Sequence, residues 1–162
     1  MRPDCGLKTL DLHLHYMRSA LGLARLAYFA DEVPIGAVVV VDGEIVGRGH
    51  NQSLRKADPT AHAEILALRQ AARRIGNYRL TSATVYCTLE PCVMCAGALV
   101  WARVQRLVYG ARDANAGALD SHLNLSQADF LNHHFEVISG VMQKESAELL
   151  KRFFDAKRNH HS

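Results

Sequence analysis

The sequence "SATVYCTLEPCVMCAGALVWARVQRLVYGA", residues 82–111, places one helix-like run between two strand-like runs. Residues 82–89 and 104–111 carry the valines and tyrosines that strands favour. Residues 92–102 are rich in helix formers, and Pro91 fits the first helical turn, where the N–H that proline lacks has no helical partner. We therefore predict a strand, a helix and a second strand in this order.

The segments on either side continue this alternation. Asp42-Gly43 lies between two apolar runs and predicts a β-hairpin. Residues 111–133 have the composition of a loop with one short helix. Further elements are expected as helices at 11–30, 61–75 and 142–158, and as a strand at 134–140. A hairpin followed by alternating helices and strands predicts an α/β fold, with a mixed five-stranded sheet covered by helices on both faces.

Length and composition are those of one globular domain, which we expect to span residues 1–162 with short flexible ends. Of all residues, 49% are hydrophobic and 22% are charged, and the formal net charge is +3. The longest apolar run, residues 33–41, is too short to span a bilayer, and the N-terminal residues lack the apolar core of a secretory signal. We therefore expect a cytoplasmic protein without membrane contact, whose thiols stay reduced.

Cys92 and Cys95 lie directly behind Pro91, at a spacing used for thiol–disulfide exchange, structural zinc binding and catalytic metal binding. In the first helical turn both thiols share one face, and the partial positive charge of the helix N-terminus favours their thiolate forms. His62, near the start of another predicted helix, offers an imidazole nitrogen. One histidine and two thiolates suit zinc and leave a fourth position for water.

Glu64 adds a proton carrier to this group. His62 and Glu64 would be roughly 200° apart on an ideal helix, so both can approach one metal only if it lies beyond the helix end. A carboxylate beside a zinc-bound water can take the water's proton and pass it to a leaving group. The alternative interpretations are a helix cap or a surface group for His62 and a helix-dipole residue for Glu64.

The order of the residues favours the catalytic interpretation. A redox pair has no use for an upstream His-x-Glu, and Cys87, the nearby thiol, is expected to pack in a strand as a small apolar residue. H-x-E followed by P-C-x-x-C is the signature of zinc-dependent nucleobase deaminases. We therefore interpret Glu64 as the catalytic proton shuttle and the remaining residues as zinc ligands: His62, Cys92 and Cys95.

Beyond this signature, residues 11–158 resemble the bacterial tRNA-specific adenosine deaminases, which convert the wobble adenosine of an anticodon to inosine. The likeness is carried by the blocks "VPIGAVVV", "GHN", "DPTAHAEILALRQAA", "NYRL", "TLEPCVMCAGALVWARV" and "VYGARDA". The resemblance implies a cytidine-deaminase-like three-layer α/β/α sandwich and one zinc ion per chain. It also implies a homodimer that binds a tRNA anticodon stem-loop.

The resemblance assigns further residues to the substrate. Asn51 would hydrogen-bond the flipped base, Val33 and Leu89 would line the pocket, and Asp113 would lie near the ribose of the target nucleotide. Phe153 and Phe154 would form an aromatic pair close to the RNA, with core packing as the alternative for each.

The chain departs from the family at two positions that concern RNA docking. After "ARDA" the family usually continues with a lysine, whereas this sequence has Asn115, and His134 stands where an arginine is common. Neither change touches the proposed zinc ligands, so the predicted chemistry is unaffected. The missing lysine removes one possible phosphate contact.

Two other functions remain open from the sequence. A relative acting on free guanine, cytosine or a nucleoside would carry the same zinc site, and a non-catalytic RNA-binding subunit would carry a structural zinc. The substrate-side blocks favour the tRNA enzyme, and an intact Glu64 argues against a purely structural site. Basic residues cluster in two segments, either as solvated helix faces or along the path of an RNA backbone. The residues assigned to that path are Arg73, Arg74, Lys151, Arg152, Lys157 and Arg158.

Overall fold

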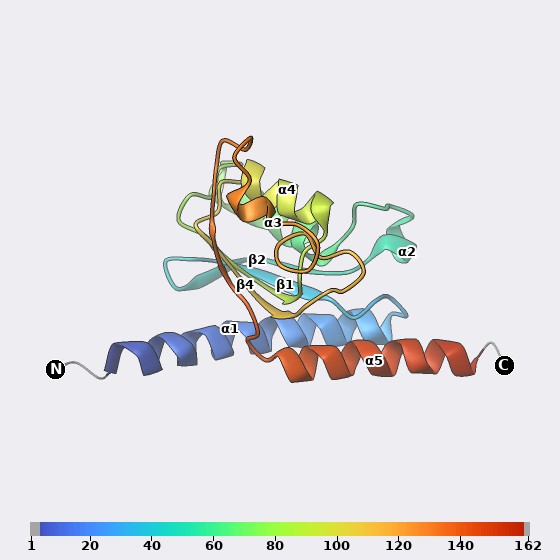
Figure 1. Cartoon of the computed structure of the whole chain (residues 1–162). Coiled ribbons are helices and arrows are strands. Elements are labelled where there is room, and N and C mark those ends of the chain that lie inside the picture. The colour runs from blue at the N-terminus through green and yellow to red at the C-terminus, as the bar shows by residue number, and fades with distance from the viewer. Residues whose placement is uncertain (1–3, 161–162) are drawn as a thin grey trace.

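A computed structural model describes residues 4–160 as one five-stranded mixed sheet between two layers of helices (Figure 1). The strands are β1 (Gly36–Val41), β2 (Glu44–His50), β3 (Thr84–Leu89), β4 (Arg106–Ala111) and β5 (Glu136–Ile138). They lie in the order β2-β1-β3-β4-β5. β1 is antiparallel to β2 and β3, whereas β3, β4 and β5 are mutually parallel. The α/β fold and the mixed five-stranded sheet are as the sequence predicts.

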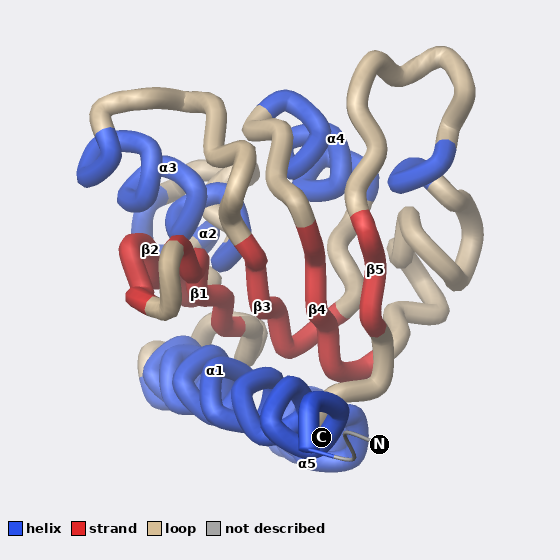
Figure 2. The backbone as a smooth tube through the Cα atoms, turned by 90° about the vertical axis from the view of Figure 1, so that its left-hand side faces the viewer, coloured by secondary structure: helices blue, strands red, loops and turns tan. Residues whose placement is uncertain are grey.

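The helices divide between the two faces of the sheet, as Figure 2 shows. α1 (Asp4–Phe29) and α5 (Gln143–Asn159) cover one face, and α3 (Ala63–Ile75) and α4 (Val93–Trp101) cover the other. α2 (Ser53–Lys56), beside α3, and the short 3-10 helix η1 (Leu125–Gln127) complete the helices of the described residues. The predicted α/β/α sandwich is confirmed.

Most element boundaries follow local signals in the sequence. The chain turns at Asp42-Gly43 between β1 and β2, with Gly43 in the left-handed region at φ 78°. α3 ends at Gly76, whose φ of 75° suits glycine. The described part of α1 begins at Asp4, earlier than the predicted start at residue 11, and the sequence gives no prediction of α2. A helix of four residues is too short to show a 3.6-residue periodicity.

Two glycines on β2 let α3 lie close to the sheet. A Cβ atom on Gly49 would stand 2.2 Å from the Ala63 carbonyl oxygen, and one on Gly47 would stand 2.2 Å from the Ala67 carbonyl oxygen. Side chains at these positions would push the helix away from the strand. The close packing therefore sets the position of the α3 N-terminus, where His62 precedes the first helical residue.

Apolar residues fill both interfaces of the sheet. One cluster packs between the sheet and the α3–α4 layer and includes Val85 and Leu99, each fully buried. The other packs against α1 and includes Met17 and Val108, also fully buried. β3 contributes to both clusters, so the strand that leads into the Cys92 motif is held from both sides. Within residues 4–160, no helix combines the length and the hydropathy needed to cross a membrane.

Candidate metal and active site

The N-termini of α3 and α4 lie close together at the C-terminal end of β3, the central strand of the sheet. His62 is the residue before α3 and has extended backbone angles, with φ −76° and ψ 154°. Cys92 precedes α4 with a similar conformation, and Cys95 lies in the first turn of that helix. Both helices thus direct their positive ends at one place, which favours anionic groups there.

The three predicted ligand side chains converge. The Nδ1 atom of His62 lies 3.7 Å from Cys92 Sγ and 3.5 Å from Cys95 Sγ. All three ligand atoms lie within 4.8 Å of one another. Tetrahedral zinc with ordinary Zn–S and Zn–N bonds requires an N–S separation of about 3.5 Å. The donor set and its dimensions therefore fit one zinc ion, and three protein donors leave one position free for another ligand.

The thiols differ in their protonation. The hydrogen bond with Cys95 lowers the pKa of Cys92 to about 4; burial opposes this shift and His62 contributes to it. The same thiol pair and burial raise the pKa of Cys95. The hydrogen bond with Cys92 raises the pKa of His62. A thiolate is thus already favoured at Cys92, as a metal ligand requires.

Glu64 lies on the first turn of α3 and is only 4% exposed. Burial raises the pKa of its carboxyl group, and the nearby charge of Cys92 acts in the same direction. The metal-binding group in the described residues does not include Glu64. Cys87 is fully buried in the core on β3, as predicted. Glu64 is thus a buried carboxyl group close to the metal-binding side chains, and its burial raises its pKa above the ordinary value.

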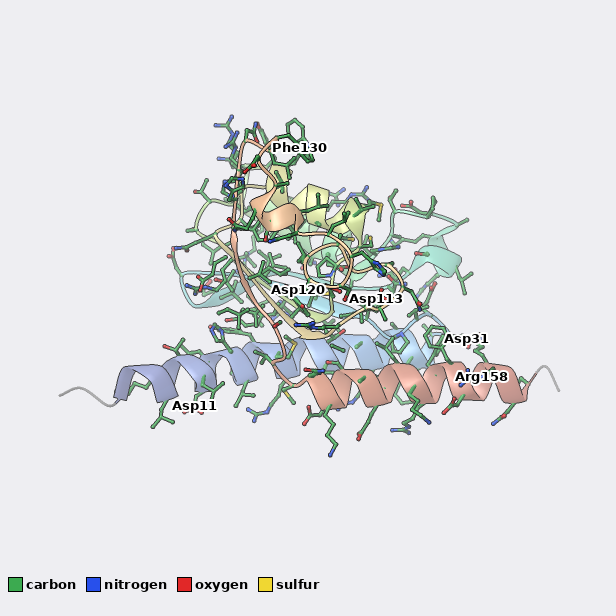
Figure 3. All side chains as sticks on the ribbon, viewed as in Figure 1. Asp11, Asp31, Asp113, Asp120, Phe130 and Arg158 are labelled. Carbon is green, nitrogen blue, oxygen red and sulfur yellow. The ribbon has the colours of Figure 1, made fainter. Side chains whose placement is uncertain are left out.

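A cavity of about 340 Å³ gathers four of the residues assigned to the substrate. Val33 comes from the loop before β1, Leu89 ends β3, Asp113 follows β4, and Phe154 comes from α5. Figure 3 labels Asp113 on the loop above α5. Segments far apart in the sequence therefore meet at one cavity, and Phe154, 47% exposed, lies partly open to solvent.

Asn51 follows β2 and is 6% exposed. Its backbone N–H donates to the carbonyl oxygen of Ile35, which lines the same cavity. Its side-chain Oδ1 is buried, and no described residue donates a hydrogen bond to it. An unpartnered buried acceptor costs about 1–3 kcal/mol. The oxygen is thus available to a donor on a bound ligand.

Phe153 and Phe154 have different surroundings. Phe153 is buried, and its ring packs edge-on against Tyr28 of α1 at a centroid distance of 5.9 Å. It lines a second, smaller cavity between α1 and α5 and does not line the 340 Å³ cavity. Phe153 thus packs against α1, whereas Phe154 contributes to the candidate substrate cavity.

Glu90 is a buried residue that the sequence analysis did not single out. Its Oε1 accepts from the backbone N–H groups of Asp120 and Ser121, and its Oε2 accepts from the Asp113 N–H and the Ser121 hydroxyl. Burial alone would raise the pKa of Glu90, but these hydrogen bonds together lower it. The Glu90 carboxylate thus holds residues 113–121, the loop that includes Asp113, through these hydrogen bonds. A glutamate directly before Pro-Cys, at the end of a buried strand, was the available signal.

The basic residues assigned to the RNA path are dispersed. Arg74 pairs with Glu44 at the opposite end of α3 from His62. On α5 the ion pairs join Lys151 and Arg158 to Asp155, and Lys157 to Asp31. Arg73 instead lines a separate groove beside β2. The structure therefore gathers the six residues at no single surface.

Comparison with known proteins places this geometry in a family. A family model for MafB19-like deaminases matches residues 12–158. The tRNA-specific adenosine deaminase of Haemophilus influenzae is 49% identical over 143 residues, which cover 88% of this chain and 83% of that protein. The chain belongs to the tRNA-specific adenosine deaminase family. The Agrobacterium fabrum member is 46% identical over 89% of this chain and 95% of its own length.

Solved structures agree with this family membership. A structure from a study of A-to-I editing by tRNA:A34 deaminases at the wobble position is 46% identical, with a TM-score of 0.81 over 83% of this chain and 98% of that chain. A guanine deaminase from Nitrosomonas europaea is 25% identical, with a TM-score of 0.74 over 86% of this chain and 83% of that chain. The likeness to the tRNA:A34 deaminase structure is thus the stronger of the two in both identity and TM-score.

The two departures from the family pattern lie outside the metal-binding group. Asn115 lines the 340 Å³ cavity beside Asp113, whose carboxylate accepts its backbone N–H at 2.9 Å. His134 is exposed, and its Nε2 lies 3.1 Å from the Ala128 carbonyl oxygen. Asn115 therefore lies at the cavity itself, whereas His134 lies in the loop before β5.

Proposed function

We propose that this chain is a zinc-dependent hydrolase, one deaminase domain that converts adenosine to inosine at the wobble position of a tRNA anticodon. The observation that carries the proposal is the His62–Cys92–Cys95 group beside a buried Glu64. It stands in a chain 49% identical to a tRNA-specific adenosine deaminase. The Glu64 carboxyl is not part of the ligand group, so it is free to carry protons.

Three side chains would hold the zinc ion: His62 through Nδ1, and Cys92 and Cys95 through their sulfur atoms. Bound there, zinc supplies the Lewis acidity that brings the pKa of a water molecule near neutrality. The low pKa of Cys92 provides one thiolate without external help.

Glu64 moves the proton in the proposed reaction. Its carboxylate accepts a proton from water, whose oxygen bonds to C6 of adenine, and returns a proton to the N6 amino group, which leaves as ammonia. Water and adenosine thus give inosine and ammonia, with Glu64 unchanged at the end. Its burial excludes other water from the proton path and keeps its proton affinity high.

The cavity residues orient the base in this proposal. Asn51 Oδ1, the buried acceptor without a partner, would receive a hydrogen bond from the base, and Val33 and Leu89 would contact its faces. Asp113 would lie at the ribose, and the exposed ring of Phe154 would stack with a neighbouring nucleotide. An anticodon loop offers unpaired bases, so the cost of flipping the nucleotide is small.

The same chemistry would be expected of a free-base deaminase, and the guanine deaminase structure keeps that second candidate in view. The cavity favours a nucleotide within RNA because it is open at Phe154, where a polynucleotide can continue. A non-catalytic zinc subunit would leave the buried Glu64 without a role.

The homodimer is a further part of the proposal. An apolar cavity of about 330 Å³ lies between α3 and α4, and its rim holds Trp101, 74% exposed, and Tyr78, 61% exposed. Large aromatic residues exposed in one patch are typical of protein interfaces. We infer that a second copy of the chain covers this patch, in line with the family resemblance.

The experiment that tests the proposed mechanism compares wild type with Glu64→Gln on an anticodon stem-loop with adenosine at the wobble position. The variant keeps the shape of the side chain, so zinc content and RNA affinity should stay at wild-type values. Inosine formation should fall by two decades or more because no group remains to carry the proton. Near-normal inosine formation in the variant would overturn the role of Glu64.

A further inference from the structure

A groove of about 290 Å³ lies on the outer surface of β2, α2 and α3. Its polar lining consists of Arg48, Gln52, Lys56, Arg69, Gln70 and Arg73. These six side chains include four cations, two amides and no carboxylate. Arg48 and Lys56 come from segments that the charge clusters of the sequence did not include. The groove is therefore a cationic surface that only the fold assembles.

The helical period and one hydrogen bond build the groove. Arg69, Gln70 and Arg73 share one face of α3, because residues three and four apart are neighbours on a helix. Gln70 Oε1 accepts the backbone N–H of Arg48 at 2.7 Å, which holds this face against β2. Lys56 ends α2, where Ala57 adopts the left-handed conformation at φ 48° and turns the chain. The cations therefore stand on rigid elements.

Among the residues that the structure describes, the four groove cations have no acidic partner at ion-pair distance. Among residues 4–160, none of them forms an ion pair within 4.0 Å, in contrast to Arg74 of the same helix, which pairs with Glu44. The carboxylate of Asp58, which lies near Arg69, accepts hydrogen bonds from the backbone N–H and the hydroxyl of Thr60. Like charges held together without counter-charges repel, and an anion in the groove would relieve this repulsion.

Two titratable groups near the groove, His50 and Asp58, have pKa values below their ordinary values. Burial lowers the pKa of His50, and the charges of Arg55 and Lys56 lower it further. Hydrogen bonds from Thr60 lower the pKa of Asp58, and Arg69 adds to that shift. The groove cations Lys56 and Arg69 thus contribute the smaller part of each shift, whose main causes are burial for His50 and the Thr60 hydrogen bonds for Asp58.

We propose that this groove binds backbone phosphates of the substrate RNA next to the flipped nucleotide. Gln52, one of the lining residues, follows Asn51 directly in the chain, so part of the groove lies one residue from the proposed base contact. Arg69 and Arg73 are about 6 Å apart along the helix axis, so they present two separate charges to a strand. The inference rests on the proposed function, because it assigns a second contact to the same substrate.

The occupant is an RNA strand and not a small anion. All four cations and Gln70 are exposed, so the groove is an open surface that a continuous chain can cross. A site for a free phosphate ion would enclose its ligand with buried donors. RNA binding at exposed cations is governed by counterion release, and this makes the salt dependence of binding the direct measure of the contact.

The test is the affinity of an anticodon stem-loop for Arg69→Gln/Arg73→Gln, measured from low to moderate salt. Arg106→Gln is the control: it removes one charge outside the groove, at a site on β4 that already has an acidic partner in Glu136. Losing two phosphate contacts should reduce the slope of log K against log salt by about 1 to 2, and should weaken binding by about tenfold or more at low salt. The control should stay within about twofold of wild type.

Further readouts separate docking from folding and from chemistry. Arg69 also lines the apolar cavity assigned to the dimer, so the sedimentation coefficient, zinc content and Tm of the double variant should all equal those of wild type. KM for the stem-loop should rise, and kcat at saturating RNA should be retained. Arg69→Lys/Arg73→Lys should restore most of the affinity, because phosphates accept lysine as a point charge. An unchanged salt slope, or an equal loss in Arg106→Gln, would overturn the proposal. The proposal would also be overturned if inorganic phosphate bound in the groove while the salt slope of RNA binding was the same in the double variant and in wild type.

The outcomes for the groove and for the proposed function differ. If wild type forms inosine but the salt slope of RNA binding does not depend on Arg69 and Arg73, the deaminase assignment stands and the proposal for the groove is refuted. If wild type forms no inosine but binds the stem-loop with a salt slope that depends on both arginines, the proposal for the groove stands and the assignment as a wobble-adenosine deaminase is refuted.

Discussion

Glu90→Gln isolates the role of one buried carboxylate in holding the substrate loop. Each of the two carboxylate oxygens of Glu90 accepts two hydrogen bonds. Three of the four donors are the backbone N–H groups of Asp113, Asp120 and Ser121, and the fourth is the Ser121 hydroxyl. Glutamine has the same shape but only one acceptor oxygen and no charge. One of the two oxygen positions must therefore become an NH2 group that faces existing donors.

The less costly orientation places the NH2 group at the Oε2 position. The Ser121 hydroxyl can then rotate and accept, but the Asp113 N–H loses its acceptor, at a cost of about 1–3 kcal/mol. The two bonds at the remaining oxygen also lose their charge assistance, which brings the total to about 2–5 kcal/mol. For a domain of this size, the corresponding fall in Tm is about 5–15 °C.

Thermal unfolding of the zinc-loaded protein measures this effect. Glu136→Gln is the control: Glu136 is exposed on β5 and pairs with Arg106 at 2.6 Å, so its loss should cost no more than about 1 kcal/mol. Zinc content should be unchanged in both variants, since neither residue belongs to the ligand group. A Glu90→Gln protein with the Tm of the control would refute the argument that this carboxylate fastens the loop.

Three other results are expected. Cys95→Ser should lose zinc and stability together, because metal binding is coupled to folding, whereas Cys87→Ser should keep its zinc; metal analysis showing the reverse would contradict the ligand assignment. Trp101→Glu should sediment as a monomer at micromolar concentrations where wild type is a dimer, and a monomeric wild type would remove the inferred interface. Burial lowers the pKa of His13, so the unfolded chain binds the proton more readily and stability should fall as the pH drops below about 6.5. His13→Gln should lack this part of the pH dependence in chemical unfolding, and parallel profiles would show that the histidine does not contribute.

The parts of the site that are local in the sequence were predictable from it. Cys92 and Cys95 share one helical turn, and Pro91 marks where that turn begins. His62 lies 30 residues before Cys92, yet its place at a helix start allowed the same edge of the sheet to be predicted for both. The hairpin and the end of α3 at Gly76 also follow from short-range backbone preferences.

The remaining features depend on tertiary contacts that no local pattern encodes. Phe153 and Phe154 are neighbours in the chain, but successive helical residues point about 100° apart, so one packs on α1 and the other lines the cavity. Glu90 has a role only because residues 113–121 fold back over it. Arg73 and Arg74 belong to one cluster of basic residues in the sequence. The sequence alone does not indicate that Arg73 lines the groove while Arg74 forms an ion pair with Glu44.

The rate of inosine formation at the wobble adenosine of an anticodon stem-loop tests the central claim most directly. It should be compared, for the same zinc-loaded protein, with the rates of deamination of free guanine, cytidine and adenosine. In the proposed function, the open cavity and the basic groove both contact nucleotides that a free base or nucleoside lacks. The stem-loop should therefore be deaminated far faster than any free substrate. Faster turnover of a free base or nucleoside would contradict the tRNA assignment, even though the zinc ligands and Glu64 would keep their roles.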